Sequence, residues 1–211
     1  MIDILIPALG ETLVMVFFST LFSLILGFIP AIVLVITSSN GLKANKAIYK
    51  ILDYVINILR SFPFIILMIS IAPITKFIVG KSIGTVAAVV PLTIAAAPFV
   101  ARVIESSLKE VDQGVIEAAK SFGASDTQII FNVMIKEAIP SIISGLTLTI
   151  ISIIGYSAMA GAVGGGGLGD AAIRNGYQRY NTEVMVVTVI ILIVIVQGLQ
   201  SLGNYLYKKL S

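Results

Sequence analysis

The chain has 211 residues, of which 57% are hydrophobic and only 12% are charged. Soluble domains carry about 25% charged residues, so this chain has too few of them to cover a surface that faces water. It contains no cysteine and no histidine, which excludes disulfides, thiolate nucleophiles, histidine bases and zinc sites, and its carboxylates are scattered, so we expect no metal site. The net charge of +3 fits a membrane topology, and we expect no nucleic-acid partner.

Five long apolar runs account for the shortage of charge. A helix rises about 1.5 Å per residue, so roughly 20 apolar residues cross the hydrocarbon core, and a helix satisfies its own backbone groups there. We therefore predict an all-α integral membrane protein with one membrane domain over residues 8–206. The predicted spans lie at about residues 12–36, 54–78, 83–103, 139–163 and 184–206, with a charged loop at 104–137 between the third and fourth spans.

Lysine and arginine residues divide unequally between the two sides that five spans define. Cytoplasmic loops carry an excess of these residues, and the richer side also holds the C-terminus. We therefore predict a cytoplasmic C-terminus and an N-terminus on the outside. The side predicted to be cytoplasmic holds Lys43, Lys46, Lys50, Arg102, Lys109, Lys120, Lys136, Lys208 and Lys209, and the other side holds Lys76, Lys81, Arg174 and Arg179.

The second predicted span contains one basic residue, Arg60. Asp53, Asn57 and Arg60 are spaced at i, i+4 and i+7, so they share one helix face. A charge within a membrane span suggests a role in transport. Arg60 lies near the cytoplasmic boundary, however, so it could instead anchor the helix by snorkelling or by pairing with Asp53.

Proline residues occur in several of the apolar runs. Proline removes a backbone donor and disturbs a helix, and neighbouring helices can satisfy the carbonyl groups that it frees. We therefore expect breaks in the helices at these positions, which are Pro30, Pro63, Pro73, Pro91 and Pro98.

The loop from Arg102 to Glu137 is the longest stretch that is unsuited to lipid. Asp112 is a plausible N-cap for a first helix, which Gly123 would end. Ser125 to Gln128 has the spacing of a capping box and predicts a second short helix. The first helix carries apolar residues at helical spacing, namely Val111, Val115, Ala118, Ala119 and Phe122. Such a pair of helices could lie on the lipid headgroups, or it could be presented to a groove on a partner.

The segment from Gly155 to Gly169 is rich in small residues and lies largely within the fourth predicted span. Gly164, Gly166 and Gly169 have the spacing G-x-G-x-x-G, but a dinucleotide site needs a preceding strand in a βαβ unit, and here a membrane span precedes the glycines. The chain also lacks a P-loop, so ATP-driven transport would need another chain. Small residues allow helices to pack closely. Alternatively the helix lines a pathway, with Tyr156, Ser157 and Met159 facing it.

The loop resembles a known family signature. Glu117-Ala118-Ala119, followed by Gly123 and Ala124, resembles the EAA loop with which permeases of ABC importers dock their ATPase subunits. In that family the motif usually continues to a Leu-Pro pair, where this chain has Ile135-Lys136 and a proline only at Pro140. The segments 57–64, 97–102 and above all 155–169 look like those of permeases of bacterial methionine importers.

The resemblance implies an ABC importer type-1 transmembrane domain in the bacterial cytoplasmic membrane. It implies a second copy of the chain, two cytoplasmic ABC ATPase subunits and an external substrate-binding lipoprotein. We expect the chain itself to bind no cofactor and to be no enzyme, with methionine (D or L) moved by alternating access. A permease of the same type for another amino acid or an osmolyte is the nearest alternative. Secondary transporters usually show internal repeats or titratable groups at mid-membrane, and an intramembrane enzyme needs a catalytic constellation, so both are weaker.

Overall fold

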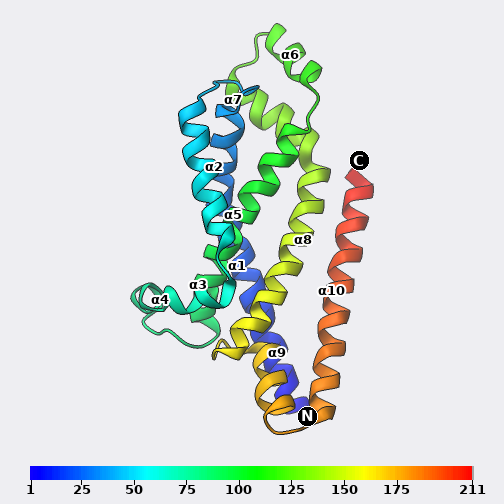
Figure 1. The fold of residues 1–211 in the computed structure, drawn as a ribbon. Helices are drawn as coiled ribbons and strands as arrows, with labels where there is room; N and C mark the ends of the chain where they lie inside the picture. The colour runs from blue at the N-terminus through cyan, green and yellow to red at the C-terminus, as the bar shows by residue number, and fades with distance from the viewer. Residues whose placement is uncertain (211) are drawn as a thin grey trace.

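The computed structural model describes residues 1–210, and it is a bundle of long helices (Figure 1). The long helices run roughly side by side. The N-terminus and the segment around α9 lie at one end of the bundle, and α6, α7 and the C-terminus lie at the other. The elements in chain order are α1 (Ile2–Thr37), α2 (Lys46–Ser61), α3 (Phe64–Ser70), α4 (Ala72–Val79), α5 (Thr85–Lys109), α6 (Gln113–Ser121), α7 (Asp126–Gln128), the π-helix η1 (Ile129–Met134), α8 (Ile135–Ala162), α9 (Gly167–Asp170), the π-helix η2 (Ala171–Tyr177) and α10 (Thr182–Leu210).

Four helical stretches are long and apolar enough to cross a membrane, namely α1, α5, α7 to α8, and α10. The second predicted span, at residues 54–78, is divided into separate helices, with breaks next to Pro63 and Pro73. Here α2 ends at Ser61, and α3 leaves it at an angle of 98°. If the bent pair of α2 and α3 counts as one broken span, the total of five predicted spans is retained.

The prolines break the helices at two of the five expected positions. Pro63 directly precedes α3, and Pro73 lies in the first turn of α4. Pro30 lies inside α1, and Pro91 and Pro98 lie inside α5, so the breaks expected there are wrong. The difference follows from packing. Because α1 and α5 bury residues along their whole length, each stays helical although proline removes one backbone hydrogen bond.

The bundle core is built where α1 packs against α5. At Gly27 the two backbones approach closely, because an added Cβ would lie 2.6 Å from the carbonyl oxygen of Ala97 and 2.9 Å from Cβ of Val100. Small residues let helices approach to this distance. Leu34 and Ile104 are buried in the same cluster as Val100, so the contact between α1 and α5 forms a large part of the bundle core.

The glycine-rich turn after α8 is fixed by the N-terminal part of α1. The backbone amide of Gly167 donates to the Glu11 carboxylate at 2.6 Å, and that of Leu168 donates to the Thr12 hydroxyl at 2.8 Å. Gly164, Gly166 and Gly167 all have positive φ, a conformation that favours glycine. These glycines therefore shape a tight helix–turn–helix connection. Within residues 1–210 there is no strand, so the context of a dinucleotide site is missing.

Candidate functional site

The first helix of the predicted loop forms as expected. The Asp112 carboxylate accepts hydrogen bonds from the backbone amides of Gly114 and Val115, at 2.7 and 3.3 Å, and thereby caps α6. The helix ends at Ser121, and Gly123 has a φ of +79°, which is typical of a glycine that terminates a helix. Both ends of α6 are thus set by residues within a few positions of the helix itself.

The apolar face of α6 is left uncovered. Ile116 is buried, in the same core cluster as Met134 of η1, and this contact ties α6 to the bundle. Phe122 at the end of α6 is 91% exposed and Val115 is 40% exposed. Of the residues that match the family signature, Glu117, Ala118 and Gly123 are exposed, and Ala119 and Ala124 are half-buried. An exposed patch of apolar side chains on a projecting helix marks an interaction surface.

The second loop helix does not stand alone as predicted. Ser125 and Gln128 form the predicted capping box, with the Ser125 amide donating to the Gln128 side chain at 2.8 Å. After α7, however, η1 runs directly into α8. The backbone stays helical through this junction, with φ/ψ of −60°/−48° at Met134 and −64°/−42° at Ile135. Pro140 lies inside α8 without ending it.

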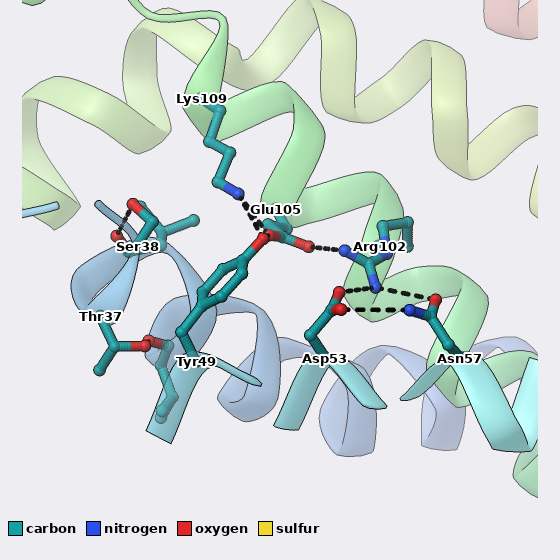
Figure 2. A network of polar contacts seen from close by, with 10 residues as sticks. Thr37, Ser38, Tyr49, Asp53, Asn57, Arg102, Glu105 and Lys109 are labelled. Atoms are coloured by element: carbon teal, nitrogen blue, oxygen red, sulfur yellow. Dashed lines mark hydrogen bonds and ion pairs between the residues drawn. The ribbon is translucent and has the colours of Figure 1, made fainter. Parts of the chain in front are cut away.

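A network of charged and polar groups joins α2 to α5 near the same end of the bundle (Figure 2). At its centre is Glu105, which is 1% exposed. Its carboxylate receives Nη1 of Arg102 and Nζ of Lys109, each at 2.6 Å. The Tyr49 hydroxyl of α2 donates to the same carboxylate at 3.1 Å. A buried carboxylate with three donors is well satisfied, so it can hold two helices in one register.

Arg102, rather than Arg60, is the partner of Asp53. Nη2 of Arg102 lies 2.6 Å from the Asp53 carboxylate and donates to Asn57 at 3.1 Å. Of the two ways in which Arg60 was expected to anchor its helix, snorkelling or pairing with Asp53, the pairing is therefore wrong. The Arg60 guanidinium instead lies over the ring of Phe99 of α5, at 4.9 Å from the ring centroid. Arg60 is exposed, and a cation–π contact at an exposed site contributes about 0.5–1 kcal/mol.

Sequence reasoning missed Tyr49, Glu105 and Lys109 of this network. The spacing of Arg102, Glu105 and Lys109 at i, i+3 and i+7 does place them on one face of α5. Their partners on α2 come from a chain segment far away in sequence. The sequence therefore indicates that the three side chains share a face of α5, but not which side chains they contact. The described residues contain no cluster of acidic side chains that could hold a metal ion.

We expect Glu105→Ala to lower the stability of the folded chain by roughly 2–3 kcal/mol. Removing one partner of a fully buried ion pair costs about 3–5 kcal/mol, and the cost is lower here because Lys109 and Arg102 are partly exposed. Thermal unfolding in detergent measures the effect. Glu137→Ala serves as the control, since Glu137 is exposed at the same end of the bundle. Equal midpoints for the two variants would contradict a stabilising role for Glu105.

The three residues predicted to face a pathway lie in different surroundings. The Tyr156 ring is half-buried and stacks on Phe64 of α3, with the ring centroids 5.0 Å apart. Ser157 is buried, and its hydroxyl donates to the carbonyl of Ile154 at 2.7 Å. Met159 is 45% exposed. Their role in a pathway stays a prediction, and on this geometry Met159 and Tyr156 are better placed for it than Ser157.

These features define a membrane protein that is a bundle of helices. One short helix projects from one end of the bundle, and its apolar face is exposed. The chain belongs to the family of binding-protein-dependent transport system inner membrane components, whose model matches residues 23–211. It is a multi-pass membrane protein.

Relatives and solved structures agree with this assignment over nearly the full length. The chain is 50% identical to the probable D-methionine transport system permease protein of Vibrio cholerae, over 99% of this chain and 93% of the relative. It is 48% identical to the methionine import system permease protein of Bacillus subtilis, over 81% of this chain and 77% of the relative. Among solved structures, an inward-facing conformation of the MetNI methionine ABC transporter matches with a TM-score of 0.97 and 40% identity, covering 100% of this chain and 98% of that chain.

Proposed function

We propose that this chain is the membrane subunit of an ATP-driven importer of methionine. The observation that carries the proposal is the open apolar face of α6, on which Ala118 is exposed, Phe122 is 91% exposed and Val115 is 40% exposed. A helix whose apolar face is open suits a groove on a partner. The two named relatives and the matching transporter are methionine transport proteins, which supports methionine as the substrate and an ABC ATPase as the partner.

The proposed assembly contains two copies of this chain, two cytoplasmic ABC ATPase subunits and an external substrate-binding lipoprotein. The end that carries α6 and the C-terminus faces the cytoplasm in this arrangement. One chain supplies few spans for a pathway of its own, so a twofold interface between two copies is the expected place for it. An uncovered face of α8 supports this, since Ser144, Leu148, Ser152, Gly155 and Met159 follow one another at helical spacing and are all exposed.

The geometry supports alternating access through the movement of nearly rigid bodies. An ATPase that moves α6 also moves α8, because Ile116 packs with Met134 of η1 and η1 continues into α8. The network around Glu105 ties α2 to α5 in the same way. Closure of the ATPase subunits would therefore reorient spans rather than bend a flexible loop.

Uptake of labelled methionine into membrane vesicles tests the proposal. The chain is produced together with its ABC ATPase and substrate-binding lipoprotein, and ATP is supplied inside the compartment that corresponds to the cytoplasm. We expect ATP-dependent uptake that excess unlabelled methionine abolishes. Uptake that another amino acid or an osmolyte abolishes, and methionine does not, would assign a different substrate to the same kind of permease. Uptake without ATP would indicate a secondary transporter instead.

We expect Met159→Trp to block methionine uptake while the subunits still assemble. Met159 lies at the outer end of the uncovered α8 face, where a larger rigid ring would obstruct a narrow passage. The measurement is uptake in vesicles, with co-purification of the ATPase as the check on assembly. Phe17→Trp on α1 is the control, since Phe17 is also exposed but lies on a different helix. Normal uptake by the Met159 variant would remove this residue from the pathway.

A further inference from the structure

Two neighbouring cavities lie between α5 and α8. The larger, of about 930 Å³, lies toward the end that carries α6 and is lined by polar side chains such as Ser106, Lys136 and Ser144. The smaller, of about 170 Å³, lies deeper in the bundle between Phe99 and Tyr156. Val103, Gly145 and Leu148 line both cavities. The two cavities are therefore neighbours on the same side of the α5–α8 pair, one with a polar lining and one between two aromatic rings.

The two aromatic walls of the smaller cavity are each supported from the broken element. Arg60 lies over the Phe99 ring, and Phe64 stacks on the Tyr156 ring with an angle of 14° between the planes. Arg60 and Phe64 flank the bend at residues 62–63, between α2 and α3. The bend thus brings one contact to each ring, a cation–π contact to Phe99 and a stacked ring to Tyr156.

The remaining lining suits a small apolar group with a polar end. Apart from the rings, the cavity is lined mainly by aliphatic side chains, together with the hydroxyls of Thr149 and Ser152. Thr149 donates to the carbonyl of Gly145 and Ser152 to that of Leu148, so their oxygen lone pairs remain to accept a hydrogen bond. Within residues 1–210 the Tyr156 hydroxyl has no hydrogen-bond partner, and it remains able to donate.

We infer that the cavity between Phe99 and Tyr156 is a substrate subsite within the membrane, which holds the apolar side chain of the transported amino acid. An apolar cavity of about 150 Å³ is large enough to bind benzene. An unbranched thioether side chain has fewer heavy atoms than benzene, so it also fits in a cavity of this volume. A thioether sulfur also makes favourable contacts with aromatic rings. Ser152 and Leu148 are exposed, so the cavity is open on the α8 face. The inference rests on the proposed function, because it takes the importer's substrate as the ligand.

A single thiol at Ser152 tests the subsite directly. The chain has no cysteine, so Ser152→Cys gives it one reactive group, whose labelling by a small methanethiosulfonate is measured as a mass shift of the permease in its assembly with the ATPase. If the dissociation constant is about 1 mM, methionine at about 10 mM occupies nine-tenths of the sites and slows labelling about tenfold. Norleucine, which replaces the sulfur with a methylene, should also protect. Lysine should not, because it would bury a charge.

Matched variants separate the subsite from a general change in the assembly. Ser144→Cys lies on the same face of α8 but lines only the larger cavity, so methionine should leave its labelling rate unchanged. Adding Phe99→Ala to Ser152→Cys should reduce the protection from about tenfold to about twofold, which corresponds to an affinity about tenfold weaker. Should that variant fail to assemble, Phe99→Leu keeps an apolar wall without the ring and should give intermediate protection.

Several outcomes would overturn the subsite. They are a thiol at 152 that does not react, labelling that methionine does not slow, equal slowing at 144 and 152, and equal protection by lysine. These outcomes leave the proposed function untouched if the unmodified importer still takes up methionine. If uptake instead shows another substrate, the protection assay is run with that amino acid, and its failure to protect overturns the subsite in the same way.

Discussion

We expect Ala118→Asp to leave the chain folded in the membrane and to abolish its stable association with the ATPase. Ala118 is exposed and lies between Val115 and Phe122 on the uncovered face of α6. A carboxylate placed there would be buried in the partner's groove without a counter-charge. An uncompensated buried charge costs about 3–5 kcal/mol, which weakens binding by more than a hundredfold.

Co-purification of the ATPase through a tag on the permease measures this effect. Lys120→Asp is the matched control, since it adds the same side chain to an exposed position on the opposite side of α6, and it should retain most of the bound ATPase. Gly123→Asp should weaken docking as well, but less severely, because its φ of +79° strains an aspartate while nothing lies within 4 Å of an added Cβ. An ATPase recovered in full with the Ala118 variant would refute the role assigned to α6.

The ends of α6 and α7 could be predicted from sequence because their determinants are local. The cap of α6 joins Asp112 to amides two and three residues away, and the capping box joins Ser125 to Gln128. Chain neighbours can satisfy such contacts in any tertiary setting. The apolar spans were predictable for a similar reason, since lipid leaves a helix as the economical way to satisfy the backbone.

The network around Glu105 could not be predicted, because it depends on how α2 is placed against α5. Arg102 and Asp53 are 49 residues apart, and Tyr49 and Glu105 are 56 apart. Sequence spacing alone offered Arg60 as one possible partner of Asp53, since both lie on one face of α2. Local spacing identifies which groups share a face, but it does not show which face another helix will cover.

The bend after α2 shows that a proline in the sequence does not by itself predict where a helix breaks. Proline occurs at Pro63, where the chain turns, and also at Pro30 and Pro98, where helices continue. The missing amide is the same in all three cases. The outcome is decided by the packing around the proline, since α2 buries only Ile56 along its length whereas α1 and α5 each bury residues along their length and pack against each other.

We expect Gly169→Ala to destabilise the fold strongly. A Cβ added at Gly169 would overlap the carbonyl oxygen of Ala158 and lie 2.5 Å from its Cα. Both are backbone atoms of α8 and cannot move aside as a side chain can. Overpacking in a core typically costs about 1–3 kcal/mol, and a clash with backbone places this variant at the upper end. Gly161→Ala meets the backbone of Gly169 and Asp170 in the same way.

Gly155→Ala is the control that separates the two functions of the glycine-rich segment. Gly155 also lies in α8, but nothing lies within 4 Å of an added Cβ, and replacing a helical glycine with alanine stabilises by about 0.5–1 kcal/mol. The measurement is the midpoint of thermal unfolding in detergent, which should fall for Gly169→Ala and hold or rise for Gly155→Ala. Equal midpoints would contradict the packing role of Gly161 and Gly169. If Gly155→Ala remains stable but slows methionine uptake, the exposed part of the segment serves the pathway and the buried part serves the fold.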